Sequence, residues 1–182
     1  MAMKRISISL LYLGMMISHG VFAEEEGGEK TIAAPGFDGK ILGLEVHADS
    51  LGVVLDISES MQRSLPAVRV LLRDKLPKNP VLHVDGCALE KPAPQASVKN
   101  GVAAETVTAV DLLGKFANAS AILWISDMGD PPNRYGVEAM AETLKRHGIT
   151  LYLLSLKNEP GPSLRKLVEG TEGTWTVVSL EG

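Results

Sequence analysis

The sequence predicts an α/β fold, with a doubly wound, mostly parallel central sheet and helices on both of its faces. Two observations support this prediction. Short apolar runs alternate about five times with segments of helical spacing, which is typical of parallel strands joined by helices. The runs are apolar at nearly every position, as expected for strands that are buried on both faces. An antiparallel strand at one edge of the sheet is an open alternative.

In the first half of the domain, the clearest strand signal is the run at residues 51–57, which is nearly all apolar and β-branched. A shorter run at residues 41–46 predicts an edge strand before it. The helix that follows is marked by an apolar stripe, and Pro77 ends it. A short strand is expected at residues 81–84. The stripe consists of Met61, Leu65, Val68, Leu72 and Leu76.

The second half of the domain continues the alternation. Residues 91–100 contain two prolines and predict a loop. Residues 103–116 have helical spacing and predict a helix. The remaining predicted elements are strands at residues 121–126, 149–156 and 175–180 and helices that end at Gly148 and Gly170.

The first 23 residues have the pattern of a cleaved export signal. Lys4 and Arg5 precede an almost entirely apolar run at residues 6–22. Small residues stand one and three positions before a cut placed after Ala23. An uncleaved membrane anchor is the alternative, but the run is near the minimum of about 17 residues for a spanning helix and contains Ser and Gly. We therefore expect a periplasmic or secreted protein without a membrane span in the mature chain.

Charge and composition narrow the remaining chain. Residues 24–40 are charged and Gly-rich, which predicts a flexible linker, and residues 41–182 are expected to form one domain. Loss of the signal removes two positive residues and no acid, so the net charge changes from −4 to −6. An acidic chain without basic clusters argues against a nucleic-acid partner. The single cysteine, Cys87, excludes an internal disulfide and is expected to be a buried thiol.

Two acidic residues stand at the ends of predicted strands. Asp56 ends the first long strand and is followed by Ser58 and Ser60, and Asp127 follows the strand at residues 121–126. Ligands of open α/β sheets bind outside the carboxyl ends of the strands, so these side chains are expected at one edge. Carboxylates and hydroxyls are hard oxygen donors, which suit Mg²⁺, Mn²⁺ or Ca²⁺ and not Zn²⁺. The sequence therefore predicts a divalent-cation site.

The segment Val-Val-Leu-Asp-Ile-Ser-Glu-Ser-Met at residues 53–61 carries an Asp-x-Ser-x-Ser motif between an apolar strand and a helix. In this feature, and over roughly residues 41–180, the chain resembles the von Willebrand factor type A domain. The family's metal-ion-dependent adhesion site adds a Thr from a later loop and an Asp after a later strand. The resemblance implies Thr106, with Thr108 as the alternative, and Asp127 for these two positions.

The resemblance also implies a function. A bound Mg²⁺, or Mn²⁺ or Ca²⁺, would accept an Asp or Glu carboxylate from a partner protein, so a protein-binding module is expected and not an enzyme. The sequence departs from the family's pattern at Glu59, where Gly is usual, and at residues 126–129, where Ser-Asp-Met-Gly stands in place of the common Thr-Asp-Gly.

Simpler roles exist for each of these residues. Ser58 and Ser60 could cap the helix that follows them, and Asp127 could form a turn before Gly129. A metal-free structural domain of the same fold is therefore an alternative function. A phosphatase with Asp56 as its nucleophile is a further one, although such enzymes usually need a second acid where Ser58 stands.

Overall fold

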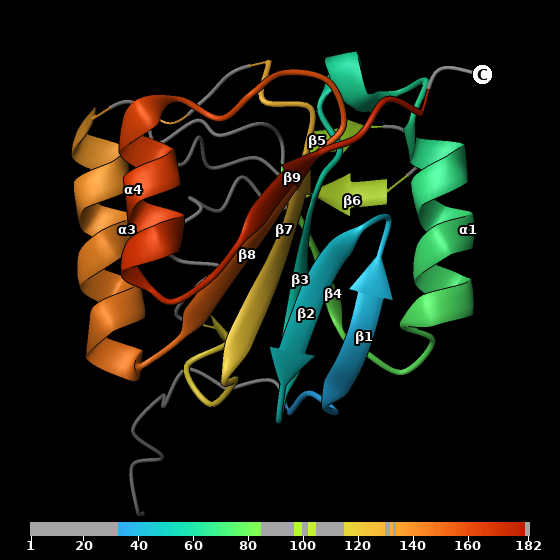
Figure 1. Ribbon diagram of the computed structural model, residues 1–182. Coiled ribbons are helices and arrows are strands. Elements are labelled where there is room, and N and C mark those ends of the chain that lie inside the picture. The colour runs from blue at the N-terminus through green and yellow to red at the C-terminus, as the bar shows by residue number, and fades with distance from the viewer. Residues whose placement is uncertain are drawn as a thin grey trace, which may run out of the picture.

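The computed structural model describes residues 33–84, 97–99, 102–104, 115–129, 132 and 134–180. Within these residues, a five-stranded sheet forms the centre of the molecule (Figure 1). All its neighbouring strands are parallel, in the order β4-β3-β7-β8-β9, and helices lie on both faces. The predicted fold class is thus confirmed. The strands are β3 (Leu51–Asp56), β4 (Val81–Val84), β7 (Ala121–Ser126), β8 (Thr150–Ser155) and β9 (Trp175–Val177).

The order of the strands contains one reversal. From β3 the chain goes to β4 on one side, whereas β7 pairs with the other side of β3 and leads to β8 and β9. The direction in which the sheet grows therefore changes between β3 and β7. In open α/β sheets, the crevice at the carboxyl ends of two such strands is where ligands bind.

The register of β3 and β7 determines which side chains meet at that edge. The two strands pair with a constant offset of 70 residues, with Leu55 opposite Ile125. Successive side chains of a strand point to opposite faces. Asp56 and Ser126 therefore come next in register and lie on the same face of the sheet as Trp124.

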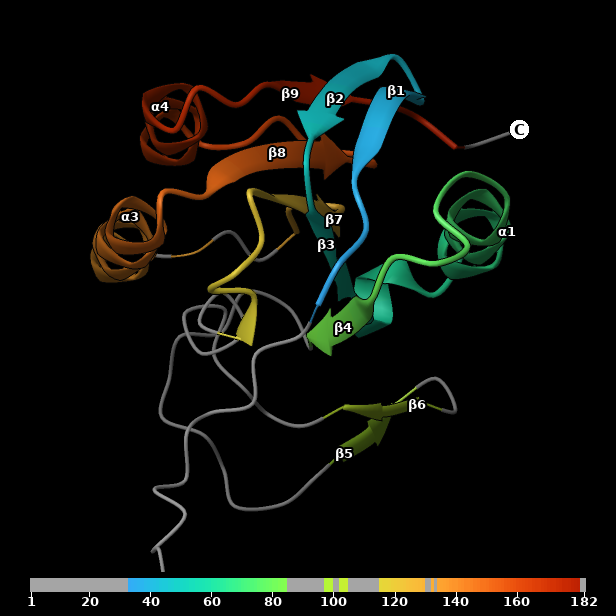
Figure 2. The same ribbon diagram turned by 90° about the horizontal axis from the view of Figure 1, so that it is seen from below.

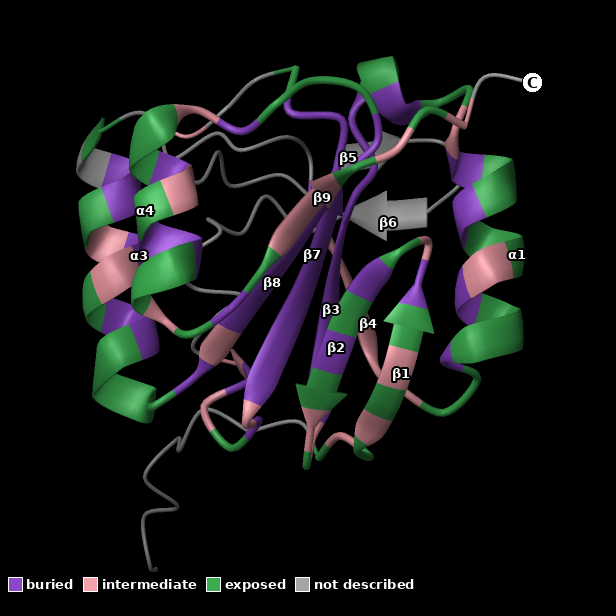
Figure 3. Ribbon diagram, viewed as in Figure 1, coloured by how far each residue is buried: buried purple, intermediate pink, exposed green. Residues whose placement is uncertain are grey.

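Helices and a hairpin cover the two faces of the sheet. Helix α1 (Leu65–Lys75) and the hairpin of β1 (Phe37–Ile41) and β2 (Leu44–Ala48) cover one face. Helices α3 (Arg134–His147) and α4 (Pro162–Gly170) cover the other (Figure 2). Two apolar clusters result, one on each face. Figure 3 shows the central strands buried along their length, with the exposed side of each helix turned to solvent.

The β1–β2 hairpin differs from what the sequence predicted. Residues 37–40, expected in the linker, form most of β1, and the single strand expected at residues 41–46 is divided by a turn. The turn residues, Leu42 with φ 47° and Gly43 with φ 86°, both have positive φ, as a type I′ hairpin requires. Among the described residues, antiparallel pairing thus occurs in separate hairpins and not at an edge of the central sheet.

The hairpin is attached to the sheet through a buried tyrosine. Ile41, Leu44 and Val46 are almost completely buried in the cluster beneath it. The Tyr152 hydroxyl on β8 donates to the His47 carbonyl at 3.0 Å and accepts from the His47 N–H at 3.3 Å. A hydroxyl that pairs with both backbone groups of one residue fixes the position of β2 over the sheet.

The helix after β3 begins later than the sequence predicted. A 3₁₀ turn, η1 (Glu59–Met61), comes first, and α1 follows from Leu65 with Pro66 in its first turn. Pro is well tolerated there because the first N–H groups of a helix have no partner within it. The predicted apolar stripe from Met61 to Leu76 is nevertheless buried throughout, at 6 % exposure or less.

A second hairpin replaces part of the predicted loop and helix in the middle of the chain. Strands β5 (Ser97–Lys99) and β6 (Val102–Ala104) pair antiparallel. The predictions of a loop over residues 91–100 and a helix from residue 103 were therefore wrong at residues 97–99 and 103–104. The Asn100-Gly101 dipeptide between the strands is a strong hairpin signal, and it outweighs the helical spacing.

Several other predictions concern residues outside the described part of the chain. They are the signal at residues 1–23, linker residues 24–32, Cys87, Thr106 and Thr108. Within the described ranges, no helix is both long and apolar enough to cross a membrane.

Candidate metal centre

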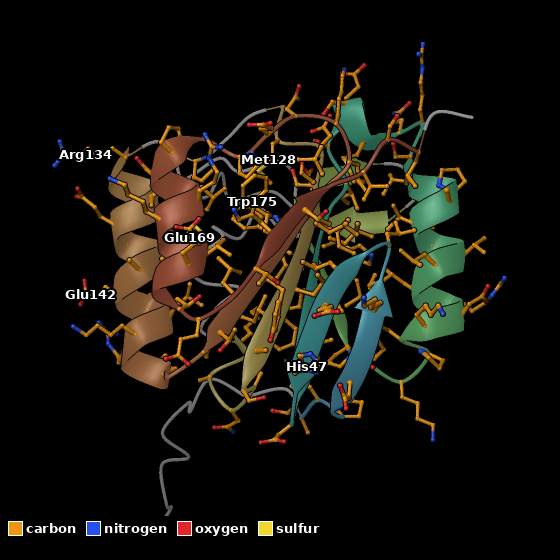
Figure 4. The ribbon with its side chains drawn as sticks, in the orientation of Figure 1. His47, Met128, Arg134, Glu142, Glu169 and Trp175 are labelled. Atoms are coloured by element: carbon orange, nitrogen blue, oxygen red, sulfur yellow. The ribbon has the colours of Figure 1, made fainter. Side chains whose placement is uncertain are left out.

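The predicted site residues lie at the carboxyl edge of the sheet, at the reversal between β3 and β7. Asp56 is the last residue of β3, and Ser58 and Ser60 follow in the connection to α1. Asp127 follows β7 directly. In Figure 4, Met128 marks this edge, whereas His47 lies toward the opposite edge on the hairpin.

Asp56 is a buried carboxylate with donors on both of its oxygens. Asp56 is only 2 % exposed. Oδ1 accepts the Ser58 N–H at 2.8 Å, and Oδ2 accepts the Ser126 hydroxyl at 2.7 Å. Burial of a carboxylate is costly unless such partners compensate for the lost water. The two hydrogen bonds hold the carboxylate in one orientation at the reversal point.

The two serine hydroxyls are neighbours. Ser58 Oγ and Ser60 Oγ are 3.2 Å apart and hydrogen-bonded to each other, and the N-cap residue of neither η1 nor α1 makes a side-chain cap hydrogen bond. The structure therefore does not support the simple capping role for Ser58. In an octahedral Mg²⁺ site with ligands at about 2.1 Å, adjacent ligand atoms are about 3 Å apart. The hydroxyl pair has the spacing of two adjacent ligands.

Asp127 and Ser60 both approach Gly129 with a side-chain oxygen. A Cβ atom placed on Gly129 would be 3.1 Å from Asp127 Oδ1 and 3.4 Å from Ser60 Oγ, so both oxygens flank one point. Asp127 is 4 % exposed, and its Oδ1 accepts the Gly129 N–H at 2.9 Å. The turn-forming role considered for Asp127 is therefore present. It coexists with the position beside Ser60.

The donors at this edge suit a hard cation. Among the described residues, no group of three or more His, Cys, Asp or Glu side chains is placed to hold a metal. A cation here would depend on two carboxylates, two serine hydroxyls and water, which fits Mg²⁺ chemistry. Thr106 and Thr108, the candidates for a further hydroxyl ligand, lie outside the described residues.

Sequence reasoning missed three residues that support the site. Ser126 donates to Asp56, and the Asn158 side chain donates to the Asp127 carbonyl at 2.9 Å. The Ser155 hydroxyl in turn donates to the Asn158 carbonyl. These residues stand at or just beyond the ends of β7 and β8. Polar residues at the carboxyl ends of neighbouring apolar strands were the signal that would have found them.

Other features of the described residues lie away from this edge. One groove of about 600 Å³ between α3 and α4 and one pocket of about 350 Å³ beside the hairpin are both near the amino ends of the strands. His83 on β4 is half-buried. Burial, and then the nearby charge of Arg69, lowers its pKa below the usual 6.5. None of these features adds a ligand to the edge that carries Asp56.

No protein-family model matches the chain, and no curated protein matches it.

Proposed function

We propose that this chain is an exported protein-binding module similar to von Willebrand factor type A domains. A divalent cation, Mg²⁺ or else Mn²⁺ or Ca²⁺, would be held at the carboxyl edge and would bind an Asp or Glu carboxylate of a partner protein. The observation that carries the proposal is the Ser58–Ser60 hydroxyl pair, which has ligand spacing, with the buried Asp56 carboxylate on the Ser58 N–H and the buried Asp127 carboxylate near the same point of Gly129 as Ser60 Oγ.

Each residue has a distinct task in this proposal. Ser58 and Ser60 would supply neutral hydroxyl ligands, and Thr106 would supply another. Asp56 would supply negative charge, held in place by the Ser58 N–H and the Ser126 hydroxyl. Asp127 would act as a second acid that holds a water or Ser60. When bound, the cation would supply a positive centre that accepts an outside oxygen ligand.

A small number of protein charges favours recognition of an acidic partner. A cation held mainly by neutral hydroxyls and water keeps its attraction for an outside carboxylate, which can bind if a coordination position is accessible. Ser60 and Gly129 are exposed, whereas both carboxylates are buried. A partner would therefore approach from the exposed side of the site, where Ser60 and Gly129 lie.

One observation favours a metal-free structural domain as the second candidate. The oxygens of Asp56 already have donors, so the fold satisfies this carboxylate without a cation. The phosphatase alternative has less support. A nucleophilic Asp56 would have to reach a phosphate from a position that is 2 % exposed and hydrogen-bonded at both oxygens.

Calorimetric titration with Mn²⁺ distinguishes the two leading candidates. The unmodified chain is expected to bind one ion, and Asp56→Ala is expected to abolish binding. Asp38→Ala is the matched control, because Asp38 is a carboxylate on the exposed hairpin and should leave binding unchanged. Absence of binding at millimolar Mn²⁺ would leave the metal-free domain as the better proposal.

A peptide experiment tests the partner chemistry. Short peptides that contain a central Asp are expected to bind only in the presence of the cation, and the matching Asn peptides are expected not to bind. Equal binding of Asp and Asn peptides would contradict coordination of a partner carboxylate. Turnover of a chromogenic phosphate ester that is lost in Asp56→Ala would instead favour the enzyme.

A further inference from the structure

The Ser126 hydroxyl connects the two strand ends that meet at the reversal point. Ser126 is the last residue of β7 and is 1 % exposed. Its hydroxyl donates to Asp56 Oδ2 at 2.7 Å and accepts the Met128 N–H at 3.1 Å. One side chain thus contacts both the carboxylate at the end of β3 and the backbone of the loop after β7.

The direction of these hydrogen bonds is determined by their partners. A backbone N–H can only donate, so the Ser126 oxygen must accept from Met128. The hydroxyl proton is then directed toward Asp56 Oδ2. Ser126 consequently orients Asp56 and starts the turn that carries Asp127.

The loop that Ser126 starts has an unusual backbone. Met128 has φ 54° and is 4 % exposed, so a buried residue with a side chain occupies the left-handed region. This conformation is costly for residues other than Gly and persists where the surroundings determine it. The Met128 N–H bond to Ser126 and the Gly129 N–H bond to Asp127 are two such determinants.

A third strand end holds the loop from its other side. The Asp127 carbonyl accepts both the backbone N–H of Asn158 at 3.2 Å and its side-chain amide at 2.9 Å. With the backbone of Asp127 held by Asn158, the Ser126 hydroxyl links this loop to Asp56.

We propose that Ser126 is a positioning residue that fixes the Asp56 carboxylate and the Asp127 loop in a single arrangement suited to a cation. This inference rests on the function proposed above. It assigns no contact between Ser126 and the cation, because the hydroxyl acts through Asp56 and the Met128 backbone. Loss of a residue that orients metal ligands typically weakens metal binding about 10- to 100-fold.

A matched pair of serine variants tests the inference. Ser126→Ala is expected to weaken Mn²⁺ binding about 10- to 100-fold in calorimetry. Ser120→Ala removes a hydroxyl of the same kind at the opposite end of β7. Ser120 directly precedes this strand and bonds to Ser50, so its loss should leave Mn²⁺ affinity unchanged. Wild-type affinity in Ser126→Ala would overturn the proposal. An equal loss in Ser120→Ala would also overturn it, because the effect would then be one of general stability.

A second measurement on the metal-free protein separates this inference from the proposed function. Asp56→Asn is expected to shift the Met128 amide resonance in the unmodified background and not in Ser126→Ala, because the hydroxyl is the link. Amide exchange at Met128 should also be about fivefold faster or more in Ser126→Ala, as expected for one lost hydrogen bond.

The two measurements distinguish a failure of the proposed function from a failure of the positioning role. A chain that binds no Mn²⁺ contradicts the proposed function and the cation part of the inference, whatever the amide spectra show. A chain that binds Mn²⁺ normally, but in which Met128 responds to Asp56→Asn without the Ser126 hydroxyl, contradicts the positioning role alone.

Discussion

The two ends of the β3–β7 strand pair are closed by residues with the same 70-residue offset but different chemistry. At the amino end, Ser50 and Ser120 exchange hydrogen bonds: each backbone N–H donates to the other's hydroxyl, at 3.0 and 2.8 Å. At the carboxyl end, a serine again faces β3, but its partner is the Asp56 carboxylate. One end is thus neutral and reciprocal, and the other is charged.

The comparison shows how a regular sheet makes one edge a candidate site. Strand pairing sets the distance between β3 and β7 at both ends, so strand spacing alone does not distinguish the amino end from the carboxyl end. At the amino end, the hydroxyls are engaged with backbone groups and add stability. At the carboxyl end, the reversal of strand order leaves room for loops that carry Ser58, Ser60 and Asp127. We therefore expect substitutions at the amino end to change stability and substitutions at the carboxyl end to change ligand binding.

The largest expected effect on stability comes from Phe116→Ala. Phe116 is completely buried and packs against Gly52 in the amino half of β3, where a Cβ atom on the glycine would be 2.6 Å from the ring. Removal of the ring should lower the free energy of unfolding by about 3–5 kcal/mol, measured by urea denaturation. Gly52→Ala tests the same contact by overpacking and should cost about 1–3 kcal/mol. A loss below 1 kcal/mol in both variants would mean that the ring is loosely packed.

The next largest expected effect is on the stabilisation by Mn²⁺, and it comes from substitution of Asp127 at the carboxyl end. Mn²⁺ at 100 times its dissociation constant should stabilise the unmodified chain by about 2.7 kcal/mol. Asp127→Ala should bind at least about tenfold more weakly, so the same Mn²⁺ concentration should add no more than about 1.4 kcal/mol. Urea titrations with and without Mn²⁺ measure both values. Equal stabilisation of the two proteins would remove Asp127 from the site.

A smaller effect is expected from Ser120→Ala at the amino end. The variant loses the hydroxyl that bonds to the Ser50 N–H and the Ser50 carbonyl. The free energy of unfolding should fall by about 1 kcal/mol, as expected for a partly buried hydrogen-bonding group. Mn²⁺ affinity should not change. A change in affinity without a change in stability would contradict the division between the two ends.

The smallest effect is a pH dependence that comes from His83, whose strand neighbour in register is Leu55. Burial, followed by the charge of Arg69, lowers the pKa of His83 in the folded chain below 6.5. The unfolded chain therefore binds more protons as the pH falls through 6.5, and stability is lost in that direction. The loss should be below about 1 kcal/mol, because the side chain is half-exposed and solvent screens its interactions.

His83→Gln should make the decrease in stability between pH 7.5 and pH 5.5 shallower, measured by urea denaturation at both pH values. His147→Gln, at the end of helix α3, is the control and should leave the contribution of His83 in place. An unchanged slope in His83→Gln would show that other groups cause the pH dependence.

Much of the central sheet could be predicted from the sequence because its strands are apolar on both faces. The run at residues 121–126 matches β7 at both ends, and residues 81–84 match β4. The β1–β2 hairpin was harder, because its Leu42-Gly43 turn lacks the Asn-Gly or Asp-Gly signature of such turns. The alternation of buried and exposed residues along β1 and β2 was present in the sequence and was a usable signal.

The site was predictable in part from the predicted order of strands. Asp56 ends one parallel strand and Asp127 directly follows another, and the carboxyl ends of parallel strands share one edge. The sequence shows Ser126 and Asn158 as polar residues near strand ends, but their roles could not be assigned, because those roles depend on which face Ser126 occupies and on the backbone path after β8. Those details follow from register and loop conformation, which single-sequence patterns do not specify. The Thr106 prediction remains a prediction, since this residue lies outside the described part of the chain.

The 70-residue offset between β3 and β7 also has a consequence for the order of folding. Closure of a loop of this length costs about 4 kcal/mol in chain entropy before the strands gain any contact. The helix α1 and the β1–β2 hairpin involve only nearby residues and can form without it. The Asp56–Ser126 contact exists only once that long loop has closed. Cation binding would therefore report that the slow, long-range step of folding is complete, and a refolding experiment should show it no earlier than burial of Trp124.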